Sequence, residues 1–289
     1  MLKRRLIAQL ILKNTLVVQS IKFKRFLPVG NPCVAAEFLN NWGIDEIVVL
    51  DIDATKENRK PNFGLVKKIS EHCFIPLSVG GGIKSIGDIH KLINCGADKV
   101  VLNSSVLIHP ELVKRASEIF GNQCIIVSID AKENGNEYKV VSHSSIKVLE
   151  ENPLRIARKF EELGAGEILL TSIDRDGSKK GYDLDLINLV AKNVKIPTIA
   201  AGGAGHPQHF FDLFKETAAA AASAGNFFHF TEHSATIVKS YLKRKNINIR
   251  FDSAIHYSDF DFNTQGRIAK MSDEYLEKQR FEIYQPEII

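Results

Sequence analysis

Short apolar runs alternate with amphipathic stretches along most of the chain. Runs such as 47–53 (IVVLDID), 124–130 (CIIVSID) and 167–174 (EILLTSID) are largely apolar on both faces, which is typical of strands in a covered parallel sheet. The stretches between them have helical spacing, so the pattern predicts a parallel α/β fold. The expected strands are 6–12, 47–53, 76–79, 99–102, 124–130, 167–174 and 197–201, and the expected helices are 63–72, 86–95, 110–120, 153–163, 184–193 and 207–215.

An internal repeat makes this prediction more specific. A shift of 121 positions superposes residues 43–53 on 164–174 and residues 75–82 on 196–203, with nine identical pairs. Two segments that share one offset indicate two (βα)₄ half-barrels, about 1–123 and 124–250, which close as a (βα)₈ TIM barrel. Two doubly wound domains are the alternative, although neither copy carries a G-x-G-x-x-G dinucleotide fingerprint.

Glycine pairs follow two equivalent strands, at Gly81-Gly82 and at Gly202-Gly203. Active sites of such barrels lie at the carboxyl ends of the strands, and glycine lets backbone N–H groups approach an anion closely. We therefore expect two phosphate sites that face each other across the mouth, and a substrate phosphorylated at both ends. The alternative is that the glycines only terminate strands.

Charged residues mark both ends of the predicted strands. Asp130 ends an apolar strand, where partial burial would raise its pKa toward the range of a general base; a helix cap or a loop salt bridge is the alternative. At the opposite end, charges with a net sum of zero sit at or just before the start of four strands. Because an isolated buried charge is very costly, these four charges must pair with one another. The plainest role for them is a structural plug that stabilises the base of the barrel. They are Arg5, Glu46, Lys99 and Glu167.

Composition excludes several classes of protein. The 289 residues hold 38 Lys and Arg against 34 Asp and Glu, a balance that argues against a dedicated nucleic-acid binder. The four cysteines form no C-x-x-C pair and the nine histidines show no metal spacing, so we expect buried reduced thiols, no metal and no cofactor. No apolar run reaches the length of a membrane span and no signal-peptide cleavage site follows the N-terminus, so we expect a cytoplasmic protein.

Several motifs resemble the cyclase subunit of imidazole glycerol phosphate synthase across roughly residues 1–250. They are SVGGGIKS (78–85), GADKVVLNSS (96–105), GNQCIIVSIDAK (121–132), GAGEILLTSIDRDGSKKGYDL (164–184) and IAAGGAG (199–205). The resemblance implies a barrel that docks a glutaminase at its N-terminal face. Ammonia would then pass along the barrel axis to a bisphosphorylated ribonucleotide at the other end.

The resemblance also implies roles for individual residues. One phosphate site maps onto Gly82 and Asn103, Asp130 maps onto one of two catalytic carboxylates, and the four charges at the strand starts map onto an ammonia gate. The second phosphate site maps onto Asp176, Gly177, Gly203, Ala204, Ala224 and Gly225, where the family usually has serine at position 225.

One departure from the family pattern affects the chemistry. The second catalytic Asp is replaced by Ile11, and the segment after it, 14–20 (NTLVVQS), lacks an acid and two bases. Loss of a general acid typically forfeits about 10² to 10⁴ in rate. This favours a resemblance to the paralogous branch of surface-polysaccharide pathways, in which the barrel passes ammonia to a separate ATP-using sugar amidotransferase.

Two alternatives stay open at this point. The first is a working cyclase of histidine biosynthesis, with Asp51 or Asp176 in place of the missing acid. It would convert the phosphoribulosyl-formimino-AICAR phosphate substrate and ammonia to imidazole glycerol phosphate and AICAR. The second is a non-catalytic scaffold.

The family's barrel ends near residue 250, which leaves a C-terminal extension of 39 residues, 251–289. Its net charge is −4, against +8 for the rest of the chain, and it holds seven of the 24 aromatic residues. Disordered segments are usually poor in aromatic residues. We therefore expect this acidic, aromatic-rich extension to dock on the barrel or on a partner.

Overall fold

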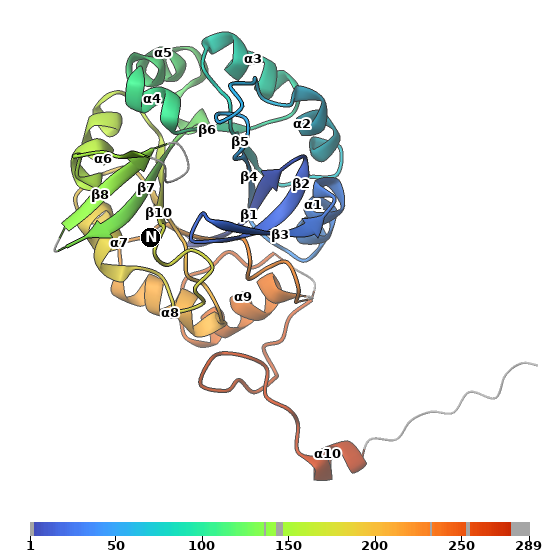
Figure 1. Ribbon diagram of the computed structural model, residues 1–289. Helices are drawn as coiled ribbons and strands as arrows, with labels where there is room; N and C mark the ends of the chain where they lie inside the picture. The colour runs from blue at the N-terminus through green and yellow to red at the C-terminus, as the bar shows by residue number, and fades with distance from the viewer. Residues whose placement is uncertain (1–2, 136, 143–146, 232, 253–254, 279–289) are drawn as a thin grey trace, which may run out of the picture.

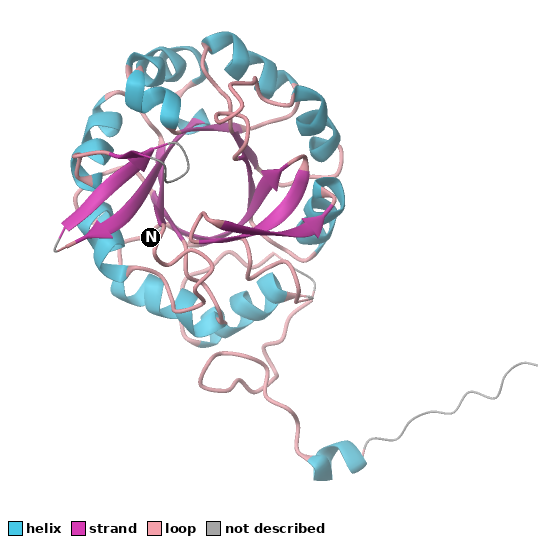
Figure 2. Ribbon diagram, viewed as in Figure 1, coloured by secondary structure: helices cyan, strands magenta, loops and turns pink. Residues whose placement is uncertain are grey.

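The computed structural model describes residues 3–135, 137–142, 147–231, 233–252 and 255–278. Within them, eight parallel strands close into a barrel that is ringed by helices (Figures 1 and 2). The predicted TIM barrel is therefore confirmed, and the alternative of two doubly wound domains is wrong. The strand order is β10 (Glu167–Ser172), β11 (Thr198–Ala201), β12 (Ala221–Ala224), β1 (Arg5–Lys13), β4 (Glu46–Asp51), β5 (Leu77–Gly80), β6 (Lys99–Leu102) and β7 (Ile125–Asn134), and β7 pairs with β10 to close the barrel.

The helices cover the outer face of these strands. The outward residues of each strand, such as Leu6, Val49 and Val127, belong to one large apolar core shared with the helices, whereas alternate residues such as Ile7, Val48 and Ile126 fill the barrel interior. The outer layer consists of α1 (Pro32–Asn41), α2 (Phe63–Ser70), α3 (Ile86–Asn94), α4 (Ser104–Ile108), α5 (Glu111–Phe120), the 3₁₀ turn η1 (Asn122–Cys124), α6 (Pro153–Glu162), α7 (Leu184–Ala191), α8 (Pro207–Glu216) and α9 (Ser234–Arg244).

Two antiparallel hairpins were not predicted. The strands β2 (Leu16–Ile21) and β3 (Arg25–Gly30) extend β1, and β8 (Glu137–Ser142) and β9 (Lys147–Val148) extend β7. Each follows the first strand of a half-barrel. The turn between β1 and β2 places Asn14 and Thr15 at positive φ, which is the geometry of a two-residue hairpin turn.

The strand pairing refines the repeat. Ile7 pairs with Glu46 in the first half and Ile126 pairs with Glu167 in the second. The first strands of the two halves therefore correspond at an offset of 119, not 121, because the paired residues of the first and second strands are 39 positions apart in the first half and 41 apart in the second. At this offset, the counterpart of Asp130 is Ile11.

Several expected boundaries were wrong. The strands expected at 47–53 and 167–174 end at Asp51 and Ser172, so Asp53 and Asp174 lie in the loops that follow. Pro110 caps α5 rather than beginning it, and α1, α4, α9 and β12 were not in the expected set.

The four cysteines, which we expected to be buried, are free but only half-buried. None of the helices in the described part of the chain has the length and hydrophobicity of a membrane span.

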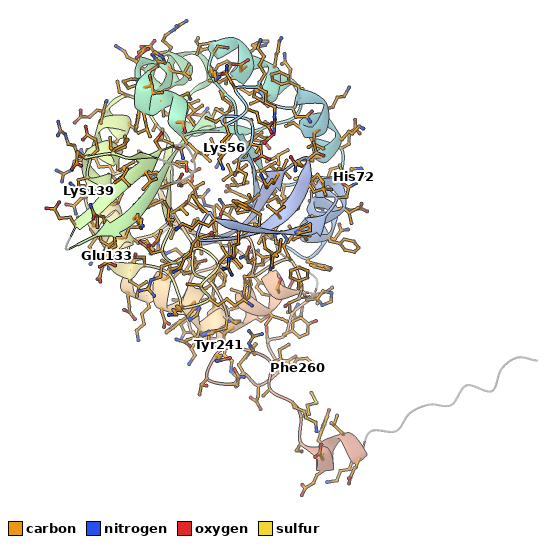
Figure 3. The ribbon with its side chains drawn as sticks, viewed as in Figure 1. Lys56, His72, Glu133, Lys139, Tyr241 and Phe260 are labelled. Atoms are coloured by element: carbon orange, nitrogen blue, oxygen red, sulfur yellow. The ribbon has the colours of Figure 1, made fainter. Side chains whose placement is uncertain are left out.

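The C-terminal extension lies partly against the outer wall of the barrel. The rings of Phe262 and Tyr241 are 5.4 Å apart. Figure 3 labels Tyr241 on α9 and Phe260 in the extension. Asp261 pairs with Arg244, and Arg267 donates a hydrogen bond to the carbonyl of Gly205. Farther along, α10 (Asp273–Glu277) is exposed and lies away from the ring of helices (Figure 1). Residues 279–289, which complete the predicted extension, lie outside the described residues.

A buried ion pair joins the last barrel helix to the first strand. Lys239 Nζ lies 2.6 Å from Asp45 Oδ1, and both side chains are 3% exposed. The other oxygen of Asp45 accepts a hydrogen bond from the backbone N–H of Leu6. Through Asp45, this pair therefore connects α9, the last helix of the barrel, to the start of β1, its first strand.

Removing one partner of this pair should be strongly destabilising. We predict that Lys239→Ala lowers the free energy of unfolding by about 3 to 5 kcal/mol, because the Asp45 carboxylate is left buried without a cation. Urea unfolding followed by circular dichroism measures this change. The matched control is Lys270→Ala, whose partner Asp273 is 77% exposed and which should change stability by less than about 1 kcal/mol. Equal effects of the two substitutions would contradict the prediction.

Candidate functional site

The carboxyl ends of the strands open on a cavity of about 490 Å³, which we call the near cavity. A second hollow of about 30 Å³, the far cradle, lies beside it, and Gln9, Ile11, Phe23 and Thr171 line both. All the residues predicted for the mouth lie in one of these two spaces. Gly82, Asn103 and Asp130 line the near cavity, and Asp176, Gly177, Gly203, Ala204, Ala224 and Gly225 line the far cradle.

Asp130 is the carboxylate best placed for proton transfer. It is 9% exposed and accepts hydrogen bonds from Asn103 Nδ2 at 2.8 Å and from the Thr171 side chain. Burial raises its pKa to about 6, with these hydrogen bonds opposing the shift. Asp130 can therefore accept or release a proton near neutral pH, and the alternatives of a helix cap or a loop salt bridge are wrong.

Across the barrel symmetry, Ile11 is the counterpart of Asp130 and offers no proton. The Ile11 side chain is 8% exposed and contributes an apolar wall to both spaces. The mouth therefore carries a titratable group on one side and a hydrocarbon on the other.

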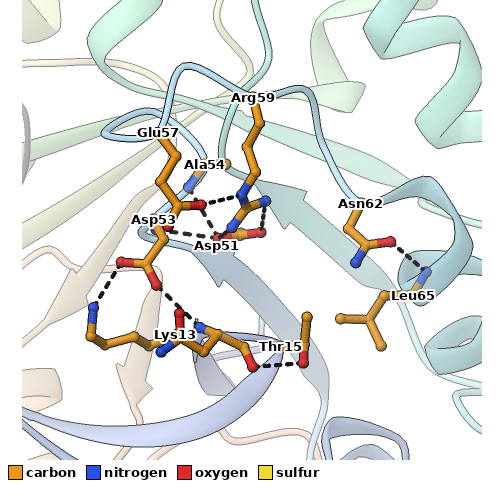
Figure 4. A network of polar contacts seen from close by, with 10 residues as sticks. Lys13, Thr15, Asp51, Asp53, Ala54, Glu57, Arg59, Asn62 and Leu65 are labelled. Atoms are coloured by element: carbon orange, nitrogen blue, oxygen red, sulfur yellow. Dashed lines mark hydrogen bonds and ion pairs between the residues drawn. The ribbon is translucent and has the colours of Figure 1, made fainter.

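The two carboxylates considered as replacement acids are already bound by other groups. Both oxygens of Asp51 accept from the guanidinium of Arg59, at 2.6 and 2.8 Å (Figure 4). Asp176 accepts from the hydroxyl of Ser20 at 2.6 Å and from the backbone N–H of Phe23 at 3.2 Å. Each of these carboxylates would have to give up such contacts before it could act on a substrate.

A polar network fixes the loop after β4. Asp53 accepts from Lys13 Nζ at 2.9 Å and from the backbone N–H of Asn14, while Asp51 accepts from the N–H groups of Asp53 and Ala54 (Figure 4). Burial alone would raise the pKa of Asp53, but the contacts with Lys13 and Asn14 outweigh it and lower the pKa. This network holds one wall of the near cavity against the end of β1.

At the base of the barrel, the four predicted charges form a closed ring of ion pairs. Arg5 contacts Glu46 at 2.5 Å and Glu167 at 2.6 Å, and Lys99 contacts Glu167 at 2.5 Å and Glu46 at 3.3 Å. Burial would raise the pKa of Glu167, but hydrogen bonds and the charges of Arg5 and Lys99 outweigh it and lower the pKa. Each acid of the ring therefore contacts both bases, and the ring closes the base of the barrel interior.

Between the ring and the mouth lies an apolar layer with a few hydroxyl groups. The pairing register places Ser78 beside Val48 and Ser223 beside Ile7, two members of this layer. The layer itself is composed of Ile7, Val48, Val101, Ile126, Leu169, Ile199, Ala201 and Ala221. Such an interior is costly for an ion but less so for a small neutral molecule.

Comparison with known proteins identifies the family. The family model described as "Histidine biosynthesis protein" matches residues 5–234. The chain belongs to this family.

Named relatives narrow the assignment to the HisF type of subunit. A protein of Vibrio vulnificus (strain YJ016), provisionally named imidazole glycerol phosphate synthase subunit hisF2, is 45% identical over 267 residues, or 92% of this chain and 98% of the relative. Imidazole glycerol phosphate synthase subunits HisF are 45% identical in Clostridium botulinum (strain Okra / Type B1) and 44% identical in Thermococcus onnurineus (strain NA1). Each covers 252 residues, which is 86% and 87% of this chain respectively and 100% of the relative.

These relatives differ in how much of this chain they match. An alignment over 92% of this chain cannot fit within its first 250 residues, so the Vibrio relative matches part of the segment beyond the barrel. The HisF subunits match a length that the barrel alone can supply.

The sequence did not indicate which residues of the β2–β3 hairpin contact the mouth of the barrel. Ser20 and Phe23 contact Asp176, which is more than 150 positions away, and Asn226 contacts Ser20 from the loop after β12. No local motif marks such contacts. The glycine at position 225 does have a structural reason, because a Cβ there would lie 2.9 Å from the carbonyl oxygen of Gln9.

The raised pKa of Asp130 predicts a stability cost at high pH. The folded state binds the Asp130 proton more tightly than the unfolded chain does, so the charged carboxylate destabilises the fold above pH 6. We predict that Asp130→Asn raises the free energy of unfolding at pH 8 by about 2 kcal/mol, and that this gain shrinks below about pH 6 and is small near pH 4.

Urea unfolding at several pH values measures this dependence. Asp261→Asn is the control, because Asp261 is 85% exposed and its pair with Arg244 is screened by solvent. A loss of stability in Asp130→Asn at pH 8, or a gain independent of pH, would contradict the assignment.

Proposed function

We propose that this chain is the barrel subunit of a glutamine-dependent synthase of the imidazole glycerol phosphate synthase type. A glutaminase partner binds at the N-terminal face, releases ammonia there, and the ammonia passes along the barrel axis to the mouth. The observation that carries this proposal is the ring of Arg5, Glu46, Lys99 and Glu167 below an apolar layer. Opening one ion pair would admit ammonia, while the apolar layer would reject ammonium.

Exposed apolar side chains near the base support the docking of a protein there. Phe74, 85% exposed, precedes the start of β5, and Ile119, 58% exposed, lies at the end of α5 just before β7. Both therefore lie toward the end of the barrel where the strands begin. Burial of exposed apolar surface of this kind stabilises protein association.

The names of the relatives favour histidine biosynthesis as the destination of the ammonia, ahead of the sugar amidation expected from the sequence. In this role the chain catalyses the cyclase reaction of imidazole glycerol phosphate synthase, with Asp130 as the proton-transferring carboxylate. Its pKa of about 6 suits such a group.

A specific observation favours a second candidate, transfer of ammonia to a separate ATP-dependent sugar amidotransferase. Ring closure needs a second proton-transfer group, and Ile11 stands where the barrel symmetry would place it. Asp51 and Asp176 are held by Arg59 and by the β2–β3 hairpin. A barrel that only conducts ammonia would need no such group.

Restoring an acid at position 11 separates the two candidates. If the chain only conducts ammonia, we predict that Ile11→Asp is at least about 100-fold faster than the unmodified chain, because it supplies the missing acid. The assay uses ammonium as nitrogen source and the bisphosphorylated ribonucleotide of the cyclase reaction as substrate. Ile11→Asn is the matched control and should not accelerate the reaction. Full cyclase activity in the unmodified chain, with complementation of a histidine auxotroph, would decide for histidine biosynthesis.

The charge ring gives a test of ammonia delivery that is independent of the acceptor. We predict that Lys99→Met changes the rate of product formation with glutamine and the glutaminase partner by about tenfold or more, and leaves the rate with free ammonium within about twofold. The reason is that ammonium in solution reaches the mouth without crossing the ring. Lys215→Met, at an exposed position on α8, is the control. Equal changes with both nitrogen sources would contradict the proposed route.

A further inference from the structure

The C-terminal extension forms a compact loop over residues 261–269, which we call the extension loop. Its two ends are joined by a hydrogen bond from the N–H of Ala269 to the carbonyl of Asp261 at 2.7 Å. At its tip, the N–H of Gly266 donates to the carbonyl of Asn263 at 2.9 Å. The extension loop is therefore held by its own hydrogen bonds and meets the barrel as one unit.

The tip of the extension loop completes the N-terminus of α8. Pro207, the first residue of this helix, has no N–H group, and the side chain of the N-cap residue His206 makes no capping hydrogen bond. The N–H of Gln208 donates instead to the carbonyl of Gln265 at 3.0 Å. The first N–H groups of a helix need partners from outside the helix, and here the extension loop supplies one of them.

Gly266 sets how closely the extension loop approaches the helices. It is buried and has a φ of +74°, and a Cβ there would lie 2.8 Å from both Pro207 Cβ and Tyr241 Cε1. Glycine accepts this backbone conformation at no steric cost, whereas other residues are strained in it. The tip is therefore fitted closely between the start of α8 and α9, and a side chain at position 266 would push it outward.

The same tip holds the loop between β11 and α8. Arg267 Nη2 donates to the carbonyl of Gly205 at 3.1 Å, and the N–H of Gly205 donates to Nδ1 of His209, also at 3.1 Å. Burial lowers the pKa of His209 to about 4, and the neighbouring His206 lowers it further, so the ring stays neutral near pH 7 and keeps its acceptor. Both backbone groups of Gly205 are bound, one of them by the extension.

Gly205 directly follows two residues that line the far cradle, Gly203 and Ala204. The carbonyl of Gly203 accepts from the N–H of Gly181 at 2.9 Å. This segment is therefore fixed by the barrel at Gly203 and by α8 and the extension at Gly205. Backbone N–H groups bind an anion only when they point toward it, so a displacement of Gly205 would change the donors that the far cradle offers.

We propose that the extension loop is a positioning element for the far cradle, which caps α8 and holds residues 203–205 in the conformation that binds an anionic group. Gly266 and Arg267 are positioning residues, because they act through the loop that follows β11. The inference rests on the proposed function, since it concerns the mouth where the phosphorylated substrate binds. Displacement of the extension loop should weaken binding at the far cradle and leave the near cavity unchanged.

Site-resolved NMR of the full chain with inorganic phosphate tests this role. The amide shifts of Gly203 and Ala204 report on the far cradle, and that of Gly82 reports on the near cavity. In Gly266→Ala the tip is pushed away from α8, so phosphate should bind the far cradle about fivefold or more weakly while its affinity for the near cavity stays within about twofold. The near cavity is therefore an internal control for a general loss of structure.

Substitutions at Arg267 separate its hydrogen bond from its charge. Arg267→Ala removes the bond to Gly205 and should weaken phosphate binding at the far cradle by about two- to tenfold, and Arg267→Lys, which keeps a donor, should restore part of this affinity. The matched control is Lys270→Ala, which removes the same charge from the extension. Lys270 pairs with the exposed Asp273, so this variant should bind phosphate as the unmodified chain does.

Three results would overturn the proposal. They are the absence of phosphate binding at the far cradle of the unmodified chain, an unchanged affinity in both Gly266→Ala and Arg267→Ala, and an equal loss at the two sites. If Gly266→Ala does not fold, Arg267→Ala decides alone, because it changes an exposed residue. The experiment needs neither ammonia nor a glutaminase, so its outcome and that of the Lys99→Met experiment can fail independently.

Discussion

The closed barrel allows only alternate residues of each strand to face its axis, and the rest of the structure depends on this constraint. Only some of the strands contribute a side chain to a given level, and the chemistry of the interior is arranged by height. The lowest level holds Arg5, Glu46, Lys99 and Glu167, the next holds apolar side chains, and Asp130 lies at the mouth. A charge left alone at the lowest level would be very costly, which is why two acids and two bases lie there together.

The two halves of the barrel have the same architecture but different chemistry. Each half begins with a strand that continues into a hairpin. In the second half that strand presents Asp130, and in the first half the equivalent position presents Ile11. The first hairpin then bends over the far cradle, where Ser20 and Asn226 hold it. A symmetric scaffold thus presents a carboxylate at one position of the mouth and a hydrocarbon side chain at the equivalent position.

The parts of the fold that follow from local pattern could be predicted from the sequence. Barrel strands such as β6 and β10 are apolar on both faces and were found within two residues at each end, because burial on both sides leaves a continuous apolar run. The β2–β3 hairpin could not be predicted, since β2 and β3 lack the Asn-Gly turn and the regular alternation that usually mark a hairpin. The hairpin of β7 and β8 does carry such a signal, Asn134-Gly135, which the prediction missed. Motifs located the mouth and the ring, but the contact of Ser20 with Asp176 spans 156 positions and has no local signal.

The source of the nitrogen that reaches the mouth tests the central claim most directly. The chain and its glutaminase partner would be supplied with glutamine labelled with ¹⁵N at the amide, together with excess unlabelled ammonium, and the product would be analysed by mass spectrometry. If ammonia enters through the charge ring, the label in the product follows the glutamine consumed and is not diluted by the ammonium in solution. Product labelled only to the isotope ratio of the bulk solution would contradict the account.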